Sequence, residues 1–284
     1  MIIDFHTHTF PASIADNVLR QLQRKSRSKP FTDATNDGLR RSMDTAGIDI
    51  SILLPVMTNT RQVSKLNDAA VRTNEHWRET GLLSFGGMHP DASDYRAELA
   101  RIHALGIPGI KLHPAYQGAD FDDIRYLRII DRAAELGLIV LTHAGWDIGI
   151  PEHNYCSTAH VRHVMKEVRP DKLILAHMGG WWDWEAVGTE LAGLPLYFDT
   201  AFSTGDILPA PGTQRTPEES HNMNREQFTK LVRQLGTDRI LFATDCPWSG
   251  QEESLQFVRD CPFSPQELAD ILGNNAQKLL GIEA

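Results

Sequence analysis

Short apolar runs alternate with amphipathic stretches along nearly the whole chain, and this alternation limits the fold more than any other feature. The amphipathic stretches have helical periodicity, as in residues 11–24, where Ile14 and Val18 are spaced for one helical face. Alternating strands and helices predict a parallel sheet, and eight such units predict an α/β protein with a (β/α)8 TIM barrel. The predicted strands are residues 1–6, 48–56, 82–88, 107–113, 138–143, 172–177, 195–200 and 239–245.

A doubly wound open sheet is the alternative arrangement, but the glycine-rich phosphate turn that such a sheet carries after its first strand is absent. No linker divides the chain, so we expect one domain over residues 1–284, with loop insertions near 25–36 and 201–223. The second insertion follows the seventh strand, and we expect it to cover the rim where the strands end. Helices are predicted at residues 11–24, 37–46, 60–79, 93–105, 121–136, 158–168, 224–235, 251–259 and 265–280, with one more ending near 191.

Composition excludes several classes of protein. The chain has 284 residues and a formal net charge of -9, which argues against nucleic acid as a partner. Its three cysteines form no CxxC pair, which favours a reduced compartment. No apolar run approaches the ~20 residues of a membrane span, and the first residues lack the basic region of a signal peptide. We therefore expect a soluble cytoplasmic protein that acts on a small molecule, touches no membrane, and can form a homo-oligomer.

Two histidines end the first predicted strand. Side chains alternate along a strand, so His6 and His8 point to one side while Thr7 points away. Two imidazoles placed in this way can bind one metal ion, and imidazole suits zinc, iron, nickel or copper. The alternative is a polar strand end with two solvated histidines.

Other polar residues recur at the ends of the predicted strands. Active sites of TIM barrels lie at the carboxyl ends of the strands, so the fold would gather these residues at one rim. Three or four histidine and aspartate groups around one point form a catalytic metal site with room for water. The strand-end residues are His6, His8, His89, Lys111, His113, His143, His177 and Asp245.

The segments that carry these residues resemble the amidohydrolase superfamily, in its amidohydrolase-related branch of metal-dependent barrel hydrolases and decarboxylases. The matching segments follow the family order over nearly the whole chain, and the last of them resembles the family's final helix. They are residues 4–8, 109–114, 142–145, 176–180, 242–247 and 274–281.

The resemblance implies a role for each matching position. His6, His8 and His143 would be nitrogen ligands of a divalent ion, and Asp245 would be the carboxylate ligand that takes a proton from a metal-bound water. His177 would orient or deprotonate that water, or bind a second ion. We expect one bound ion, and a second ion is an open alternative. Zn²⁺ is the preferred ion, because zinc lowers the pKa of bound water to about 7.

Three strand-end residues are expected to face the substrate. Lys111 is favoured as a substrate-facing ammonium, with a carboxylated metal bridge and a structural ion pair as alternatives. His113 is expected to be substrate-facing rather than ligating, and His89 either lines the pocket or makes a loop hydrogen bond. The tryptophans at positions 181, 182 and 184 either wall an aromatic substrate or pack a helix start.

The sequence thus predicts a metal-dependent hydrolase that activates water against a small-molecule ester, lactone or amide. The alternative is a metal-dependent non-oxidative decarboxylase, or C–C lyase, acting on a carboxylated aromatic or dicarboxylic acid. A non-catalytic metal-binding regulatory protein is the third hypothesis. A decarboxylase needs cationic groups for the substrate carboxylate, which Lys111 could supply.

Overall fold

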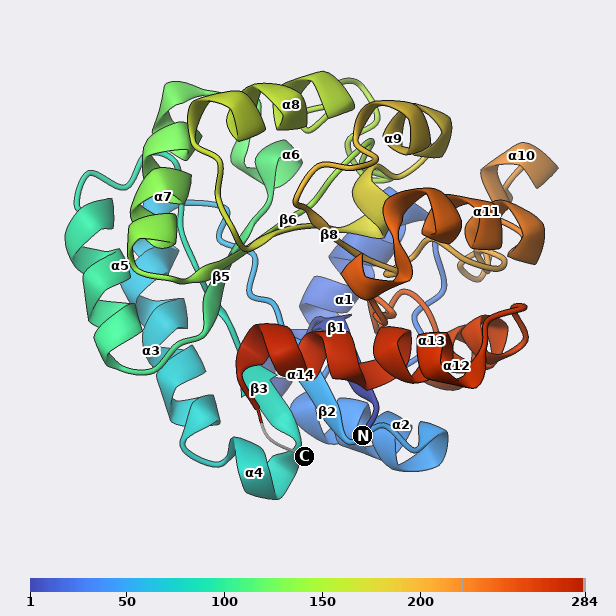
Figure 1. Cartoon of the computed structure of the whole chain (residues 1–284). Helices are drawn as coiled ribbons and strands as arrows, with labels where there is room; N and C mark the ends of the chain where they lie inside the picture. The colour runs from blue at the N-terminus through green and yellow to red at the C-terminus, as the bar shows by residue number, and fades with distance from the viewer. Residues whose placement is uncertain (221, 283–284) are drawn as a thin grey trace. The chain divides into compact units, whose positions relative to one another are not determined.

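The computed structural model describes residues 1–220 and 222–282, so the predicted insertion at 201–223 is described except for residue 221. Contacts divide the chain into two compact units (Figure 1). One unit comprises Met1–Leu53 together with Asp199–Ala284, and the other comprises Leu54–Phe198. The single domain expected from the sequence stays a prediction.

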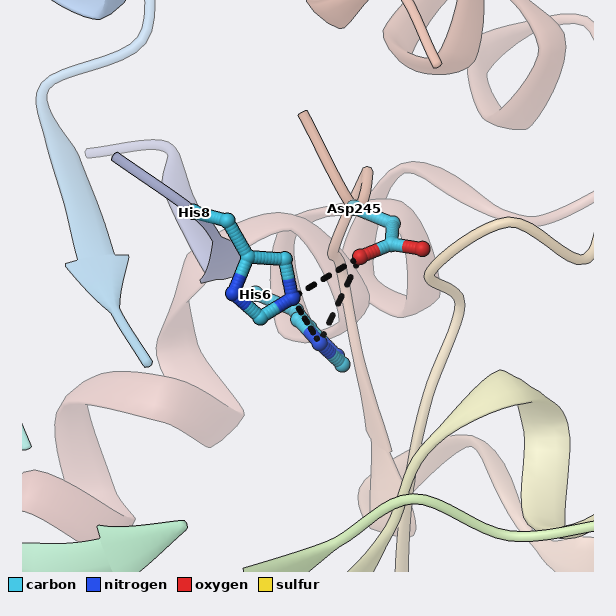
Figure 2. Close-up of side chains that lie close together, drawn as sticks. All are labelled: His6, His8 and Asp245. Atoms are coloured by element: carbon cyan, nitrogen blue, oxygen red, sulfur yellow. Dashed lines mark hydrogen bonds and ion pairs between the residues drawn. The ribbon is translucent and has the colours of Figure 1, made fainter. Parts of the chain in front are cut away.

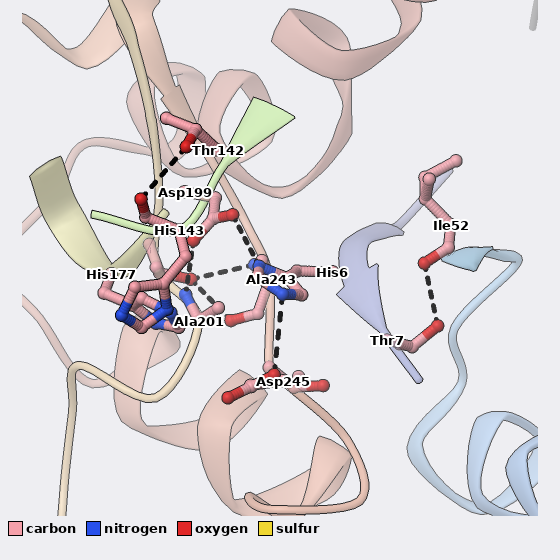
Figure 3. Close-up of polar contacts among 12 residues, drawn as sticks. His6, Thr7, Ile52, Thr142, His143, His177, Asp199, Ala201, Ala243 and Asp245 are labelled. Atoms are coloured by element: carbon pink, nitrogen blue, oxygen red, sulfur yellow. Dashed lines mark hydrogen bonds and ion pairs between the residues drawn. The ribbon is translucent and has the colours of Figure 1, made fainter. Parts of the chain in front are cut away.

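The first unit is built around β1 (Ile3–Thr7), whose five residues are all buried. It pairs in parallel with β2 (Ile50–Leu53), and the hydroxyl of Thr7 donates to the carbonyl oxygen of Ile52 at 2.8 Å (Figure 3). On the other side of β1, the Phe5 amide donates to the carbonyl oxygen of Phe242 at 2.9 Å. The segment that carries Asp245 therefore lies directly beside the strand that carries His6 and leads into His8.

The remaining elements of the first unit are mostly helices that agree with the predicted ones. The last predicted helix is interrupted by a π-helical segment, and one short helix inside the predicted insertion was not expected. These elements are α1 (Ala12–Ser26), α2 (Asn36–Ala46), α10 (Pro217–Ser220), α11 (Arg225–Leu235), η3 (Thr237–Arg239), β9 (Ile240–Leu241), α12 (Gln251–Arg259), α13 (Pro265–Ala269), η4 (Asp270–Asn274) and α14 (Asn275–Leu280).

The two predicted insertions are hydrogen-bonded to each other within this unit. The Lys29 amide donates to the carbonyl oxygen of Leu208 at 2.8 Å, and the Ala210 amide donates to that of Arg27 at 2.9 Å. The guanidinium of Arg215 donates to the carbonyl oxygen of Ser26. The insertions therefore form one tied structure, whereas the sequence suggested two separate loops.

The second unit contains a parallel sheet whose strands are buried. Its registered pairs set Gly87 beside Lys111 and Lys111 beside Leu141. Further along the sheet, Leu175 lies beside both Thr142 and Phe198. Because parallel strands end at the same edge, the residues that follow β5, β6 and β7 lie next to one another. The strands of this sheet in the second unit are β4 (Gly86–Gly87), β5 (Gly109–Leu112), β6 (Ile139–Thr142), β7 (Leu173–Leu175) and β8 (Tyr197–Asp199), and β3 (Leu82–Ser84) precedes them in the chain but is not part of this sheet.

Helices of the second unit follow the sheet, with α3, α5 and α7 side by side in Figure 1. The predicted third strand is divided at Phe85 into β3 and β4, and the predicted helix 60–79 is divided into three elements. The helices are η1 (Thr60–Gln62), α3 (Val63–Asn74), α4 (Trp77–Thr80), α5 (Tyr95–Ala104), α6 (Pro114–Gln117), α7 (Ile124–Glu135), α8 (Thr158–Glu167), η2 (His177–Gly179) and α9 (Trp184–Glu190).

Two asparagines of α3 bind backbone groups of β3 and β4. The side-chain amide of Asn74 accepts from the Ser84 amide at 2.7 Å and donates to the Ser84 carbonyl oxygen at 2.9 Å. Asn67, which is fully buried, accepts from the Gly87 amide at 2.9 Å and donates to the Gly87 carbonyl oxygen at 3.3 Å. Asn67 also donates to the buried carboxylate of Glu98 at 2.7 Å. These contacts hold the divided strand against the helix.

We expect Asn67→Ala to destabilise the protein by about 3 kcal/mol, because it leaves buried groups of Gly87 and Glu98 without their amide partner. Ser64→Ala, at an exposed position of the same helix, is the control and should change stability by less than about 0.5 kcal/mol. Urea unfolding followed by circular dichroism measures both variants. Equal stability of the two variants would show that the Asn67 contacts contribute little.

Candidate metal centre and histidine cluster

Three of the predicted ligands converge in the first unit (Figure 2). The Nε2 atoms of His6 and His8 lie 3.2 Å apart. Oδ1 of Asp245 lies 3.5 Å from the first nitrogen and 3.1 Å from the second. The Asp245 amide donates to the carbonyl oxygen of His6 at 2.8 Å, which fixes the aspartate beside the strand (Figure 3).

This arrangement suits a divalent metal ion. Ligands bound at 2.0–2.2 Å around a tetrahedral ion are roughly 3 Å apart, which is the spacing of these three atoms. The imidazole planes of His6 and His8 are inclined by 77°, so both nitrogens can point at one position. Imidazole nitrogen and carboxylate oxygen together suit zinc and other first-row ions.

A buried carboxylate that the sequence analysis did not identify orients the first ligand. Oδ2 of Asp199 lies 2.8 Å from Nδ1 of His6, and both side chains are buried (Figure 3). An ionised carboxylate only accepts, so Nδ1 carries the proton and Nε2 keeps the lone pair that a metal requires. Such carboxylate–histidine pairs accompany most metal-binding histidines. The available signal was an aspartate at the end of the seventh predicted strand.

The Asp4 carboxylate supports the same strand from within the core. It accepts from the Thr244 amide at 2.9 Å, from the Thr244 hydroxyl at 2.6 Å and from the Gln251 amide at 2.7 Å. Complete burial raises the pKa of Asp4 to about 6, although the hydrogen bonds from Gln251 and Thr244 oppose that shift. Asp4 thereby joins β1 to the segment that carries Asp245.

The second unit brings together His113, His143 and His177, which follow β5, β6 and β7. The imidazoles of His113 and His143 are stacked, with centroids 4.4 Å apart and planes inclined by 13°. Nδ1 of His143 lies 2.9 Å from Nε2 of His177, and Nε2 of His143 lies 3.2 Å from the carbonyl oxygen of Trp146. Burial, followed by the charges of neighbouring groups, holds the pKa of His143 well below its usual range. His143 is therefore in the neutral form that binds metals.

A sharp turn places His177. The backbone φ angle is 59° at His177 and 54° at Met178. Two consecutive non-glycine residues therefore adopt the left-handed backbone conformation after β7. The indole N–H of Trp184 donates to the carbonyl oxygen of His177 at 3.0 Å. This hydrogen bond anchors Trp184 to the turn that carries His177. Trp181 is buried and stacks on the exposed Trp182, with centroids 4.3 Å apart.

The three predicted substrate-facing residues also belong to the second unit. The side chain of Lys111 on β5 is buried, with 1% of its surface exposed. The ring of His113 accepts at Nδ1 from the Tyr116 amide at 3.4 Å. His89 follows β4, and its Nδ1 accepts from the Asp91 amide at 3.2 Å. Burial lowers the pKa of His89. Their roles toward a substrate stay predictions.

Gln117 is a further buried residue that the sequence analysis did not identify. Its amide donates to the carbonyl oxygens of Met57 and Met88 at 2.8 and 2.7 Å. Its oxygen accepts from the Tyr126 hydroxyl at 2.7 Å and from the His113 amide at 3.1 Å. One side chain therefore uses all its hydrogen-bonding capacity to fix the loops after β4 and β5. Its position in the short helix α6 gave no sequence signal.

We expect the double variant His6→Ala, His8→Ala to lose the bound divalent metal, because two of the three converging ligand atoms are removed. His103→Ala, at an exposed position of α5, is the control and should keep the metal. Elemental analysis of protein never exposed to a chelator measures both. Wild-type metal content in the double variant would contradict the assignment of His6 and His8.

A family model described as Amidohydrolase matches residues 3–282. A search of curated protein sequences returned no match. Among the described residues, no helix is long and apolar enough to cross a membrane.

Several solved structures are similar over nearly their whole length. An uncharacterised TIM-barrel protein from Bordetella bronchiseptica has a TM-score of 0.73 at 19% identity, covering 99% of this chain and 98% of that one. A 2,6-dihydroxybenzoate decarboxylase from Rhizobium has a TM-score of 0.68 at 15% identity, covering 99% and 98%. A 5-carboxyvanillate decarboxylase from Novosphingobium aromaticivorans, complexed with manganese and 4-hydroxy-3-methoxy-5-nitrobenzoic acid, has a TM-score of 0.71 at 14% identity, covering 99% and 96%. The predicted (β/α)8 barrel is thereby confirmed.

Proposed function

Because the chain belongs to the amidohydrolase family, we propose that it is a metal-dependent non-oxidative decarboxylase, or C–C lyase, of a carboxylated aromatic acid. The observation that carries this proposal is the burial of the Lys111 side chain at the strand-end edge beside His143. A buried cation suits a substrate carboxylate, whereas hydrolysis of a neutral ester requires none. The decarboxylases among the similar structures support the same choice.

We propose that His6, His8, His143 and Asp245 together bind one divalent ion. The convergence of three of these residues in the first unit supports the proposal, as does the neutral form of His143. The fold supports it as well, because strand ends of a TIM barrel share one face. When bound, the ion would supply positive charge that stabilises negative charge on the reacting molecule. Zinc was the expected ion, and manganese in a similar structure makes it an equal candidate.

The protein's own residues would then divide the work of decarboxylation. Lys111, with His113 and His89 as further candidates, would hold the substrate and exclude water from it. The bond between the ring carbon and the carboxyl carbon breaks, carbon dioxide leaves, and the electron pair stays on the ring carbon. His177 would donate a proton to that carbon. Its Nε2 lies 2.9 Å from Nδ1 of His143, the proposed ligand atom.

The hydrolase predicted from the sequence is the second candidate function, and the donor set of Asp245 with two histidines favours it. In that reaction Asp245 would accept a proton from water, and His177 would orient the water. The two candidate reactions use the same residues but break different bonds, a C–C bond in decarboxylation and an ester, lactone or amide bond in hydrolysis. Analysis of the reaction products therefore distinguishes them.

We expect manganese- or zinc-loaded protein to release carbon dioxide from carboxylated phenols faster than it hydrolyses aryl esters, lactones or amides. Carbon dioxide release and chromatography of the products measure the two reactions on matched substrate panels. Ester, lactone or amide turnover without decarboxylation would overturn the proposal in favour of the hydrolase. Stoichiometric metal without turnover on any panel would favour the non-catalytic metal-binding protein.

We expect His177→Asn to keep its metal and to lose 10²–10⁴-fold in turnover, roughly the usual contribution of a general acid or base. Asp245→Asn should lose metal affinity and activity together, because it removes a charged ligand. Metal content and turnover are measured on the same preparations. Full metal with near-normal turnover in His177→Asn would remove this residue from the mechanism.

A further inference from the structure

A buried carboxylate in the second unit lies against the stacked histidine pair, and none of the roles above includes it. Asp147 belongs to the loop after β6, and 6% of its surface is exposed. Its Oδ2 lies 3.7 Å from Nε2 of His113 and 3.8 Å from Nε2 of His143. The carboxylate is therefore nearly equidistant from the same edge of both rings.

Backbone partners fix the proton on each ring. The Tyr116 amide can only donate, so Nδ1 of His113 is an acceptor and its proton is on Nε2. The Trp146 carbonyl oxygen can only accept, so Nε2 of His143 is the protonated nitrogen of that ring. Both N–H groups consequently lie on the edge of the stacked rings that faces Asp147.

The same geometry distinguishes this group from the candidate metal centre. Three potential ligand atoms from His113, His143 and Asp147 lie within 4.8 Å of one another. Nitrogens of stacked rings point in parallel directions, and these two carry protons, so they do not converge on one ion. The rings of His6 and His8, inclined by 77°, do converge. The group in the second unit therefore suits a negative charge that attracts two N–H groups.

The loop holds Asp147 in this orientation. Its Oδ1 accepts from the Gly149 amide at 2.8 Å, and its carbonyl oxygen accepts from the Ile150 amide at 3.1 Å. One carboxylate oxygen thus closes the turn while the other faces the rings. The turn also fixes the preceding carbonyl, that of Trp146, against Nε2 of His143.

We propose that Asp147 is a positioning residue for the metal centre, which holds His143 with Nε2 protonated and Nδ1 as its metal-binding nitrogen. His113 shares the carboxylate and supports the ring by stacking. Another of the proposed histidine ligands, His6, also has a buried carboxylate beside its ring, that of Asp199. This inference rests on the proposed role of His143 as a ligand. Nε2 of His177, 2.9 Å from Nδ1 of His143, shows that this side of the ring already meets a polar group.

Asp147→Asn removes the negative charge but keeps the turn, because the asparagine side-chain oxygen can still accept from the Gly149 amide. We expect its affinity for Zn²⁺ or Mn²⁺ alone to fall about 10- to 100-fold, as for other partners of ligating histidines. Asp183→Asn is the matched control. Asp183 accepts from the indole N–H of Trp146 at 3.2 Å and from Asn154 at 2.5 Å, so it anchors the same loop away from the histidines. The control should keep wild-type affinity.

Titration calorimetry on the full chain measures these affinities, with His143→Ala as the reference for the ligand itself. Unchanged affinity in His143→Ala would refute the proposed ligand set. Weakened binding in His143→Ala with normal binding in Asp147→Asn would refute the positioning role alone. Loss of a second metal equivalent in Asp147→Asn would make Asp147 a ligand and overturn the proposal.

A measurement on the unaltered protein keeps the proposal testable if Asp147→Asn does not fold. Nitrogen-15 spectra of histidine-labelled, metal-depleted protein report the tautomer of each ring. We expect both His113 and His143 to be protonated at Nε2, and His143 to change at Nδ1 when Zn²⁺ is added. Protonation of either ring at Nδ1, or a change at Nε2 of His143 on adding metal, would overturn it.

Discussion

A buried carboxylate beside an imidazole is the interaction on which both functional clusters depend. Ionised groups are costly to remove from water unless an N–H group or a positive charge compensates them. Asp199 and His6 meet this condition at 2.8 Å, and the pair leaves the opposite nitrogen of the ring as an acceptor. Asp147 lies 3.7 and 3.8 Å from Nε2 of His113 and of His143, on the ring edge whose protons the backbone partners fix. The atoms that can bind a metal follow from the carboxylate contact in the first unit and from the backbone contacts in the second.

The strand ends were the part of the candidate site that the sequence could predict, because alternation along β1 and the order of the strands are local patterns. His6, His8 and Asp245 lie together within one unit, and His113, His143 and His177 lie together within the other. Asp147 and Gln117 could not be predicted, since their partners are set by loop geometry and long-range pairing, whereas Asp199 had a signal in its place at the end of the seventh predicted strand. The division of the third strand at Phe85 depends on side-chain amides of α3, which no apolar pattern records.

The choice between lyase and hydrolase rests on how water is treated at the site. Hydrolysis consumes a water molecule, so that reaction requires space for one beside the ion. Decarboxylation needs none, and a dry cavity strengthens the attraction between an ammonium and a carboxylate. Lys111, buried within β5, suits the second situation.

Asn67 and Asn74 have a consequence beyond holding the divided strand. Each presents one acceptor and one donor to a single residue, which is what a neighbouring strand presents across a sheet. A helix thereby completes the hydrogen bonding of Ser84 and Gly87 with side chains. Backbone groups that are already satisfied cannot template the addition of a foreign strand. At these two positions, the side chains of α3 therefore occupy the backbone groups that a foreign strand would need for edge-to-edge association.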